Sequence, residues 1–361
     1  MRSINDFVQG AKIGAILILL ACSASAQSGG GYTVTKSVVA GGGGTASGGT
    51  FTTDGTIGQP AAGTNSSGGS FTLQGGYWAG GTSVAKSIHS RADFDGDGKT
   101  DLSVFRPSDG NWYALKSDGG VLVTSWGAAT DTTVPGDYDH DGKADMAVYR
   151  PSSGQWFILR SSDFTVNVVG WGAGGDVPTA GDFDGDGKAD EAVYRPSAGQ
   201  WFVFRSSDNG ASIINWGNPT DVPVQSDYDG DGKTDVAVFR PSTGQWFLFR
   251  STDGPLVAGW GIAGDKPIEA DYDGDNKDDI AVYRPSDGNW YIFRSSDSSA
   301  SIVNWGNATD IPVPGDYDGD GKDDEAIYRD GTWFVLQSTA GVLVANWGAT
   351  GDIPVPAKYI P

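Results

Sequence analysis

The chain of 361 residues contains 56 Gly, and its 13 Trp, 15 Phe and 13 Tyr exceed what a disordered or collagen-like chain carries. Its 45 acidic residues outnumber its 24 Lys and Arg, which gives a formal net charge of -21. A chain with this charge repels nucleic acid and anionic membranes, so we expect neither as a partner. We expect instead a folded protein whose carboxylates attract cations.

Residues 1–26 resemble an export signal, because an apolar stretch at 13–20 precedes the Ala-Ser-Ala sequence at 24–26. We therefore expect a secreted or cell-surface protein without this segment. Cys22 follows Leu-Leu-Ala, so a lipid anchor on this cysteine stays open as an alternative. It is the only cysteine, so we expect no intrachain disulfide, and no later stretch is long and apolar enough for a transmembrane helix.

Residues 27–82 form a separate segment with 18 Gly and two charged residues, Lys36 and Asp54. Runs of β-forming residues at 32–40, 50–59 and 70–79 are separated by turn-like stretches at 41–44 and 65–69. The segment is therefore expected to be ordered β structure, with a flexible linker as the alternative.

Residues 83–361 contain six repeats, marked by Asp-aromatic-Asp sequences at 93, 137, 182, 227, 271 and 316, with intervals of 44 or 45 residues. In the fourth repeat we expect strands at 222–226, 236–240, 245–250 and 256–260, with an acidic loop at 227–235. Four strands in about 45 residues are typical of one propeller blade. The sequence therefore predicts an all-β fold, a β-propeller of six four-stranded repeats.

Twelve of the 13 Trp recur at two fixed places in the repeat, the start of the third strand and the end of the fourth. We expect both sets to pack between neighbouring blades, since a repeat unit cannot bury its own faces alone. A ring of sugar-stacking platforms is the alternative. The two sets are Trp112, Trp156, Trp201, Trp246, Trp290 and Trp333, and Trp126, Trp171, Trp216, Trp260, Trp305 and Trp347.

Each repeat carries the pattern D-x-D-x-D-G-x-x-D or a near match. Carboxylates at positions 1, 3, 5 and 9, with the backbone carbonyl of a Lys at position 7, offer the oxygen ligands that Ca²⁺ prefers. Position 6 needs a sharp turn, which suits Gly and, in the fifth loop, Asn276. The predicted ligands are Asp93, Asp95, Asp97, Lys99 and Asp101; Asp137, Asp139, Asp141, Lys143 and Asp145; Asp182, Asp184, Asp186, Lys188 and Asp190; Asp227, Asp229, Asp231, Lys233 and Asp235; Asp271, Asp273, Asp275, Lys277 and Asp279; and Asp316, Asp318, Asp320, Lys322 and Asp324.

These loops differ from EF-hands, which need a Glu at position 12 and flanking helices. Position 12 is Val104 in the first loop and Val238 in the fourth, each within an expected strand. Six bound Ca²⁺ would change the formal charge from -21 to -9, by adding twelve positive charges. A solvated acidic turn without metal is the alternative.

The loop Asp-Tyr-Asp-Gly-Asp-Gly-Lys, the Trp-Gly after the fourth strand and the Pro-Gly-Asp before the loop resemble the FG-GAP or VCBS repeats of integrin alpha subunits and exported bacterial proteins. The resemblance covers about residues 84–361. It implies a propeller that binds Ca²⁺ between the first two strands of each blade, on one face of the disc. It also implies an adhesion or ligand-binding scaffold whose partner is an extracellular protein or a glycan.

The sequence offers few groups for catalysis. His140 replaces a Gly at position 4 of the second loop, where we expect it to be exposed, and His89 is the only other histidine. We therefore expect no enzyme; a glycan-active enzyme or a lectin on the same propeller is the alternative. A recurring Arg is expected to stack on Trp or pair with Asp, with an anionic glycan as the other option. These residues are Arg106, Arg150, Arg195, Arg240, Arg284 and Arg329.

The last residues, 353–359, resemble the strand before each loop, with Lys358 in the place of the first Asp. Two forms of ring closure are compatible with this pattern. In one, this strand and the three runs within 27–82 form a seventh, metal-free blade. In the other, six blades close the ring and residues 27–82 lie outside it.

Overall fold

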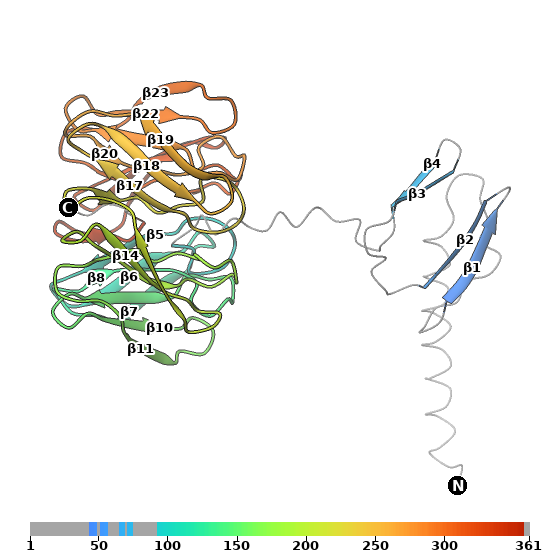
Figure 1. Cartoon of the computed structure of the whole chain (residues 1–361), viewed down its shortest axis with the longest axis horizontal. Coiled ribbons are helices and arrows are strands. Elements are labelled where there is room, and N and C mark those ends of the chain that lie inside the picture. Colours follow the sequence, from blue (N-terminus) through green and yellow to red (C-terminus); the bar gives the residue numbers. More distant parts are fainter. Residues whose placement is uncertain (1–42, 49–50, 57–64, 69–70, 75–91, 357–361) are drawn as a thin grey trace, which may run out of the picture. The chain divides into compact units, whose positions relative to one another are not determined.

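The computed structural model describes residues 43–48, 51–56, 65–68, 71–74 and 92–356 (Figure 1). The chain divides into two compact units, Met1–Val84 and Ala85–Pro361. The expected signal segment at 1–26, Cys22, the expected strand at 32–40, His89 and Lys358 lie outside the described residues. No helix within the described ranges is long and apolar enough to cross a membrane.

The first unit contains two antiparallel strand pairs, β1 (Gly43–Gly48) with β2 (Phe51–Thr56) and β3 (Asn65–Gly68) with β4 (Phe71–Gln74). β2 and β4 fall within expected strands. The expectation of turns at 41–44 and 65–69 is wrong in part, because β1 begins at Gly43 and β3 spans most of the second stretch. Pairing uses backbone N–H and C=O groups, so Gly- and Ser-rich segments can supply strands that their side chains do not indicate.

The second unit is a β-propeller of six four-stranded antiparallel sheets, and five of its blades are continuous in sequence. Blade 2 contains β8 (Thr132–Thr133), β9 (Met146–Arg150), β10 (Gln155–Leu159) and β11 (Val166–Gly170). Blade 3 contains β12 (Val177–Pro178), β13 (Glu191–Arg195), β14 (Gln200–Phe204) and β15 (Ala211–Asn215). Blade 4 contains β16 (Val222–Pro223), β17 (Val236–Arg240), β18 (Gln245–Arg250) and β19 (Gly254–Gly259). Blade 5 contains β20 (Lys266–Pro267), β21 (Ile280–Arg284), β22 (Asn289–Phe293) and β23 (Ala300–Asn304). Blade 6 contains β24 (Ile311–Pro312), β25 (Glu325–Arg329), β26 (Thr332–Gln337) and β27 (Gly341–Asn346).

Blade 1 is assembled from both ends of this unit. It contains β28 (Ile353–Pro354), β5 (Leu102–Arg106), β6 (Asn111–Leu115) and β7 (Val121–Ser125). β28 pairs antiparallel with β5 and places Ile353 opposite Phe105. The six-bladed closure is therefore correct and the composite seventh blade is wrong. The C-terminal strand completes the first repeat, whose described part begins at its acidic loop.

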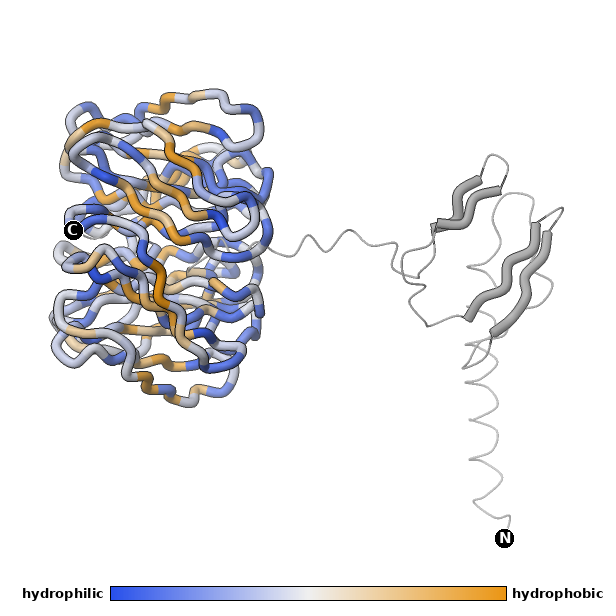
Figure 2. The backbone as a smooth tube through the Cα atoms, in the orientation of Figure 1, coloured by the Kyte–Doolittle hydropathy of each residue, from blue (hydrophilic) through white to orange (hydrophobic). Residues whose placement is uncertain are grey.

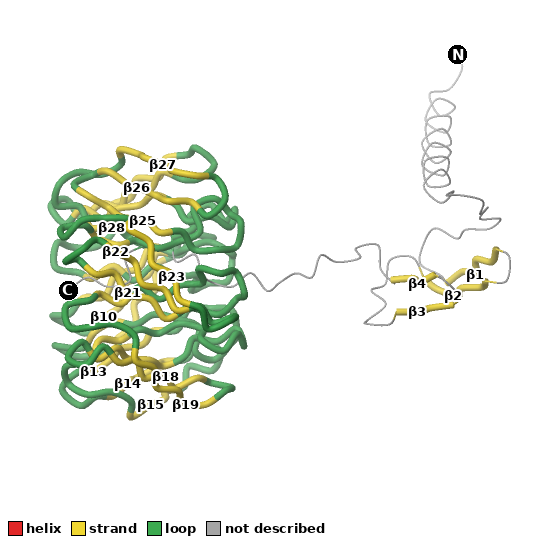
Figure 3. The backbone as a smooth tube through the Cα atoms, turned by 90° about the horizontal axis from the view of Figure 1, so that it is seen from above, coloured by secondary structure: helices red, strands yellow, loops and turns green. Residues whose placement is uncertain are grey.

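The core lies between the blades. The second strand of each blade is buried along nearly its whole length, as at Val236, Ala237, Val238 and Phe239 of β17, because both of its faces meet other side chains. The third strand alternates buried and half-buried residues, and the fourth is largely exposed. Figure 2 shows hydrophobic segments along the strands, and Figure 3 shows loops at both ends of them.

Tryptophan side chains connect neighbouring blades. Trp246 is fully buried, and its indole Nε1 donates to the carbonyl of Trp260 in the same blade at 2.7 Å. The Nε1 of Trp260 donates to the carbonyl of Tyr291 in the next blade at 3.0 Å. Trp347 completes the circle by donating to Tyr113 of blade 1 at 3.2 Å. The expected packing is confirmed, and the buried first set has no face free for a sugar.

Candidate metal centres

Six acidic loops precede the second strands of the blades, and in blades 2 to 6 the loop connects the first strand to the second. We number them 1 to 6 by blade; they span residues 93–101, 137–145, 182–190, 227–235, 271–279 and 316–324. In loops 2 to 6 an antiparallel bridge joins the residue before position 1 to position 9, for example Ser226 to Asp235 in loop 4. The bridge closes the base of the loop, so the carboxylates between these residues are held in a confined space.

Position 1 organises the backbone of its loop. In loop 4, Asp227 accepts from the N–H of Gly230 at 2.6 Å and from the N–H of Gly232 at 2.9 Å. Both glycines have positive φ, and His140 and Asn276 adopt the same left-handed conformation at positions 4 and 6 of loops 2 and 5. The expected turn at position 6 is confirmed. Position 4 needs the same conformation, which we did not predict.

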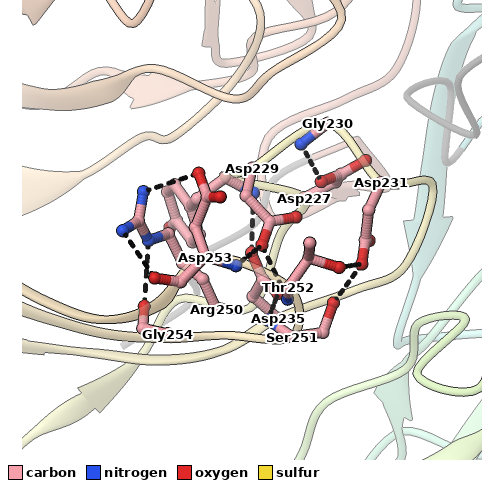
Figure 4. Close-up of polar contacts among 11 residues, drawn as sticks. Asp227, Asp229, Gly230, Asp231, Asp235, Arg250, Ser251, Thr252, Asp253 and Gly254 are labelled. Carbon is pink, nitrogen blue, oxygen red and sulfur yellow. Dashed lines mark hydrogen bonds and ion pairs between the residues drawn. The ribbon is translucent and has the colours of Figure 1, made fainter.

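Position 9 connects the loop to a second segment. Asp235 is buried; one of its oxygens accepts from the N–H of Tyr228 at 2.9 Å and the other from the N–H of Ser251 at 2.7 Å. Ser251 begins the turn between the third and fourth strands (Figure 4). The same bond recurs in every blade, from Ser117, Ser161, Ser206, Ser251, Ser295 and Ser338.

This turn also holds the carboxylates at positions 3 and 5. The backbone N–H groups of Thr252 and Asp253 donate to one oxygen of Asp229 at 2.9 and 2.8 Å, and the Ser251 hydroxyl donates to Asp231 (Figure 4). Our reading of the sequence missed this segment. In the sequence this segment is marked by a Ser that follows the third strand of every repeat and is itself preceded by Lys, Arg or Gln.

The structure brings positions 1, 3 and 9 together. One carboxylate oxygen from each member of a triad lies within 4.8 Å of the others, and position 5 stands outside these triads. The Lys at position 7 donates its backbone N–H to the Asp at position 5, as in Lys233 to Asp231 at 2.9 Å. Triads in five loops are Asp93, Asp95 and Asp101; Asp137, Asp139 and Asp145; Asp182, Asp184 and Asp190; Asp227, Asp229 and Asp235; and Asp271, Asp273 and Asp279.

The carboxylates of the triads are difficult to ionise together, because they lie close to one another and position 9 is buried. Burial raises the pKa of Asp235 to about 7, and the charges of Asp229 and Asp227 act in the same direction. In loop 6, burial and the charges of Asp318 and Asp316 likewise raise the pKa of Asp324 to about 7. Burial and nearby Asp residues raise the pKa to about 7 at Asp101 and Asp279, and to about 6 at Asp145 and Asp190.

Three triads also contain a carboxylate oxygen without a partner. The Oδ1 atoms of Asp139, Asp229 and Asp273, all at position 3, are buried and have no hydrogen-bond partner among the described residues. A buried acceptor without a donor is costly, and more so when it belongs to a charged group. These oxygens can act as ligands of a cation without giving up another bond.

The recurring arginines pair with aspartates at the opposite end of the strands. Arg240 makes two parallel bonds of 2.8 Å to the buried carboxylate of Asp221 and stacks on the ring of Phe247. The expected pairing with Asp is confirmed, whereas the stacking partner is Phe or Tyr rather than Trp. The pairs are Arg106–Asp352, Arg150–Asp131, Arg195–Asp176, Arg240–Asp221, Arg284–Asp265 and Arg329–Asp310.

His140 is exposed, as expected, but it also contacts the next loop. Its Nδ1 lies 2.7 Å from the carbonyl oxygen of Gly187 in loop 3. It therefore bridges two loops and does not only face solvent.

The FG-GAP-like repeat model matches residues 93–148, which contain loops 1 and 2. No curated protein matches the chain. The propeller is similar to a streptogramin B lyase at 6% identity and a TM-score of 0.48, covering 73% of this chain and 86% of that one. It is also similar to an Agrocybe aegerita lectin that recognises non-reducing terminal N-acetylglucosamine, at 15% identity and 0.48, covering 69% and 75%.

A virginiamycin B lyase of Staphylococcus aureus is similar at 6% identity and a TM-score of 0.45, covering 70% of this chain and 83% of that one. Likenesses this remote carry no argument about function. The repeat match at residues 93–148 and the six four-stranded blades agree with each other, and together they fit a β-propeller built from FG-GAP-like repeats.

Proposed function

We propose that this protein is an exported calcium-binding propeller that acts as a non-catalytic scaffold for adhesion or ligand binding. The observation that carries the proposal is the set of position-3 oxygens at Asp139, Asp229 and Asp273, which are buried beside other carboxylates without a donor. A hard cation would give these oxygens a bonding partner and would reduce the repulsion between the carboxylates. An acidic turn without metal leaves both costs in place.

The donor set favours Ca²⁺ over other ions. Positions 1, 3, 5 and 9 supply carboxylates and position 7 supplies a backbone carbonyl, so all the proposed ligands are oxygens. Ca²⁺ accepts six to eight oxygens in flexible geometry, whereas Mg²⁺ requires a tighter octahedron and keeps its water. A bound Ca²⁺ would supply positive charge at each triad.

Repetition supports a scaffold over an enzyme. The loop aspartates and the paired arginines keep the same partners from blade to blade, as Arg106 with Asp352 and Arg240 with Asp221 illustrate. Catalytic groups usually break such symmetry at one place, because their environment must differ from a structural one. The proposed ligand is an extracellular protein or a glycan.

Calorimetric titration of the metal-free protein tests the calcium assignment. We expect six Ca²⁺ per chain and weaker binding of Mg²⁺. A tenfold excess of Ca²⁺ over Kd adds roughly 1.4 kcal/mol per site, so rigorous chelation should lower the melting temperature strongly. Fewer than two ions bound, or an unchanged melting curve after chelation, would refute the proposal.

A glycan array with and without Ca²⁺ tests the kind of ligand. Calcium-dependent binding without turnover favours a lectin-like scaffold, and cleavage of a bound glycan would show that the enzyme alternative is correct. If no glycan binds, we expect the ligand to be a protein. A pull-down with purified extracellular matrix proteins then tests this expectation.

A further inference from the structure

Neighbouring acidic loops are joined by direct backbone hydrogen bonds. The N–H at position 8 of each loop donates to the carbonyl of position 1 in the preceding loop, at 2.6 to 2.7 Å. The bond from Thr100 to Asp316 joins loop 1 to loop 6, so the series has no end. The six bonds run from Ala144 to Asp93, Ala189 to Asp137, Thr234 to Asp182, Asp278 to Asp227, Asp323 to Asp271 and Thr100 to Asp316.

One peptide unit therefore belongs to two loops. In loop 4 the peptide between Lys233 and Thr234 donates its N–H to Asp182 of loop 3 at 2.6 Å. In the proposed assignment its C=O, from Lys233, is a calcium ligand of loop 4. The peptide is planar, so the orientation of the C=O fixes that of the N–H. Ordering one loop thus also constrains position 1 of the loop before it.

The side chain at position 7 adds a second contact across the same boundary. Lys233 lies over Gly185 of loop 3, so closely that a Cβ added to this glycine would be 2.8 Å from the Lys Cε. Between loops 2 and 3, His140 makes the contact with Gly187 instead. The corresponding Gly and Lys pairs elsewhere are Gly96 and Lys143, Gly230 and Lys277, Gly274 and Lys322, and Gly319 and Lys99.

We propose that the six calcium sites bind cooperatively around a closed circle, each site coupled to its two neighbours. Filling one loop orders the shared peptide and lowers the ordering cost of the adjacent loops, which raises their affinity. This inference rests on the proposed calcium function. A closed circle has six couplings for six sites, one more than a linear array of the same length.

Two pairs of isosteric variants separate adjacent from opposite loops. Asp184→Asn with Asp229→Asn disables loops 3 and 4, which share a boundary, and Asp184→Asn with Asp318→Asn disables loops 3 and 6, which share none. Calorimetry on the full chain gives the overall calcium binding constant of the wild type, each single variant and each double variant. The double-mutant cycle cancels intrinsic differences between loops and leaves only the coupling between the two that are disabled.

The coupling factor is the factor by which an occupied loop raises the calcium affinity of the other loop in the cycle. We expect a factor of about five or more from the adjacent cycle, within the usual range for linked sites, and a factor of one from the opposite cycle. A factor of one from both cycles, with six ions bound to the wild type, overturns the coupling alone. Absence of calcium binding to the wild type overturns the proposed function as well. Circular dichroism checks folding; if a variant unfolds, Asp186→Asn, Asp231→Asn and Asp320→Asn at position 5 repeat both cycles.

Discussion

At the scale of single residues, Asp229 has two oxygens in opposite situations. One accepts two backbone N–H groups from the turn at Thr252 and Asp253, and the other is buried without a partner. In the Asp229→Asn variant the amide oxygen can keep the two bonds, and the amide nitrogen faces the carboxylates of the triad. We expect this variant to be slightly more stable than the wild type in EDTA and less stable in Ca²⁺, with one bound ion fewer by calorimetry.

Asp253→Asn is the matched control, because it removes the same charge beside the same loop from a side chain that is half exposed. It should leave the ion count unchanged. A loss of one ion in both variants, or in neither, would contradict the assignment of Asp229 as a ligand.

Arg240 tests the pairs at the opposite end of the strands. In Arg240→Ala the buried carboxylate of Asp221 loses both bonds from the guanidinium, and breaking a buried pair costs about 3–5 kcal/mol. Arg240→Lys keeps the charge without the two parallel bonds, so we expect a smaller loss of stability. Chemical denaturation of the calcium-bound forms measures both. Equal losses would mean that charge alone, and not the paired geometry, stabilises this site.

The left-handed turn at position 6 could be predicted from the sequence, because Gly and Asn adopt that conformation more readily than other residues. The recurrence of the arginines predicted a structural role and Asp as one kind of partner, but not which Asp each arginine pairs with. The donors to positions 3 and 5 could not be derived in the same way. Ser251 and Thr252 are 20 or more residues from their acceptors, and Ser and Thr are common in any turn.

At the scale of the loop, the raised pKa values predict how stability depends on pH. A carboxyl group whose pKa is raised on folding, as at Asp235, binds its proton more tightly in the folded state. As the pH rises above 3.8, the ordinary pKa of Asp, the unfolded chain loses this proton before the folded protein does. In EDTA we therefore expect the free energy of unfolding to fall as the pH rises from about 4 to about 7, with calorimetric melting as the measurement.

Calcium should reverse this slope. The ion requires ionised carboxylates, so its affinity and the stability that it adds both rise with pH over the same range. Melting temperatures in millimolar Ca²⁺ should thus increase from pH 4.5 to pH 7 while those in EDTA decrease. The same slope in both buffers would mean that these aspartates are not ligands.

The strands themselves were largely predictable. Those expected at 236–240 and 245–250 match β17 and β18, since the continuous apolar run of β17 and the alternating burial of β18 are typical of strands packed between blades. The first strand was expected at 222–226 but β16 ends at Pro223. Beyond it Val224 still donates its N–H to the carbonyl of Ala237 at 2.9 Å, and Ser226 pairs with Asp235 through a separate bridge, so the rest of the expected segment contacts the second strand without a continuous ladder.

At the scale of the whole molecule, ring closure depends on the last strand. Deleting residues 352–361 removes β28 and Asp352, which leaves β5 with an unpaired edge and Arg106 without its carboxylate. The loss of one such pair, about 3 kcal/mol, should lower the melting temperature by about 6 °C or more. Deleting residues 27–82 is the control, because β1 to β4 pair only with one another among the described strands. Equal effects of the two deletions would contradict this closure.

The position of β28 explains why the sequence alone left six or seven blades open. Repeats counted from the acidic loops begin one strand later than the blades do, so a leftover strand at 353–354 fits either a new blade or the first one. Periodicity is the same in both arrangements. Only the pairing of Ile353 with Phe105, far apart in sequence, distinguishes them.

This closure also imposes an order in time. During synthesis, β5 to β7 are the first strands of the propeller to emerge, yet the carboxylate that pairs with Arg106 follows 246 residues later. At about 5–20 residues per second the first blade waits roughly 12–50 s with its inner edge open, while blades 2 to 6 can each finish from contiguous sequence. The first blade to be made is thus the last to be completed, and a nascent chain interrupted before residue 353 presents a bare strand edge to its surroundings.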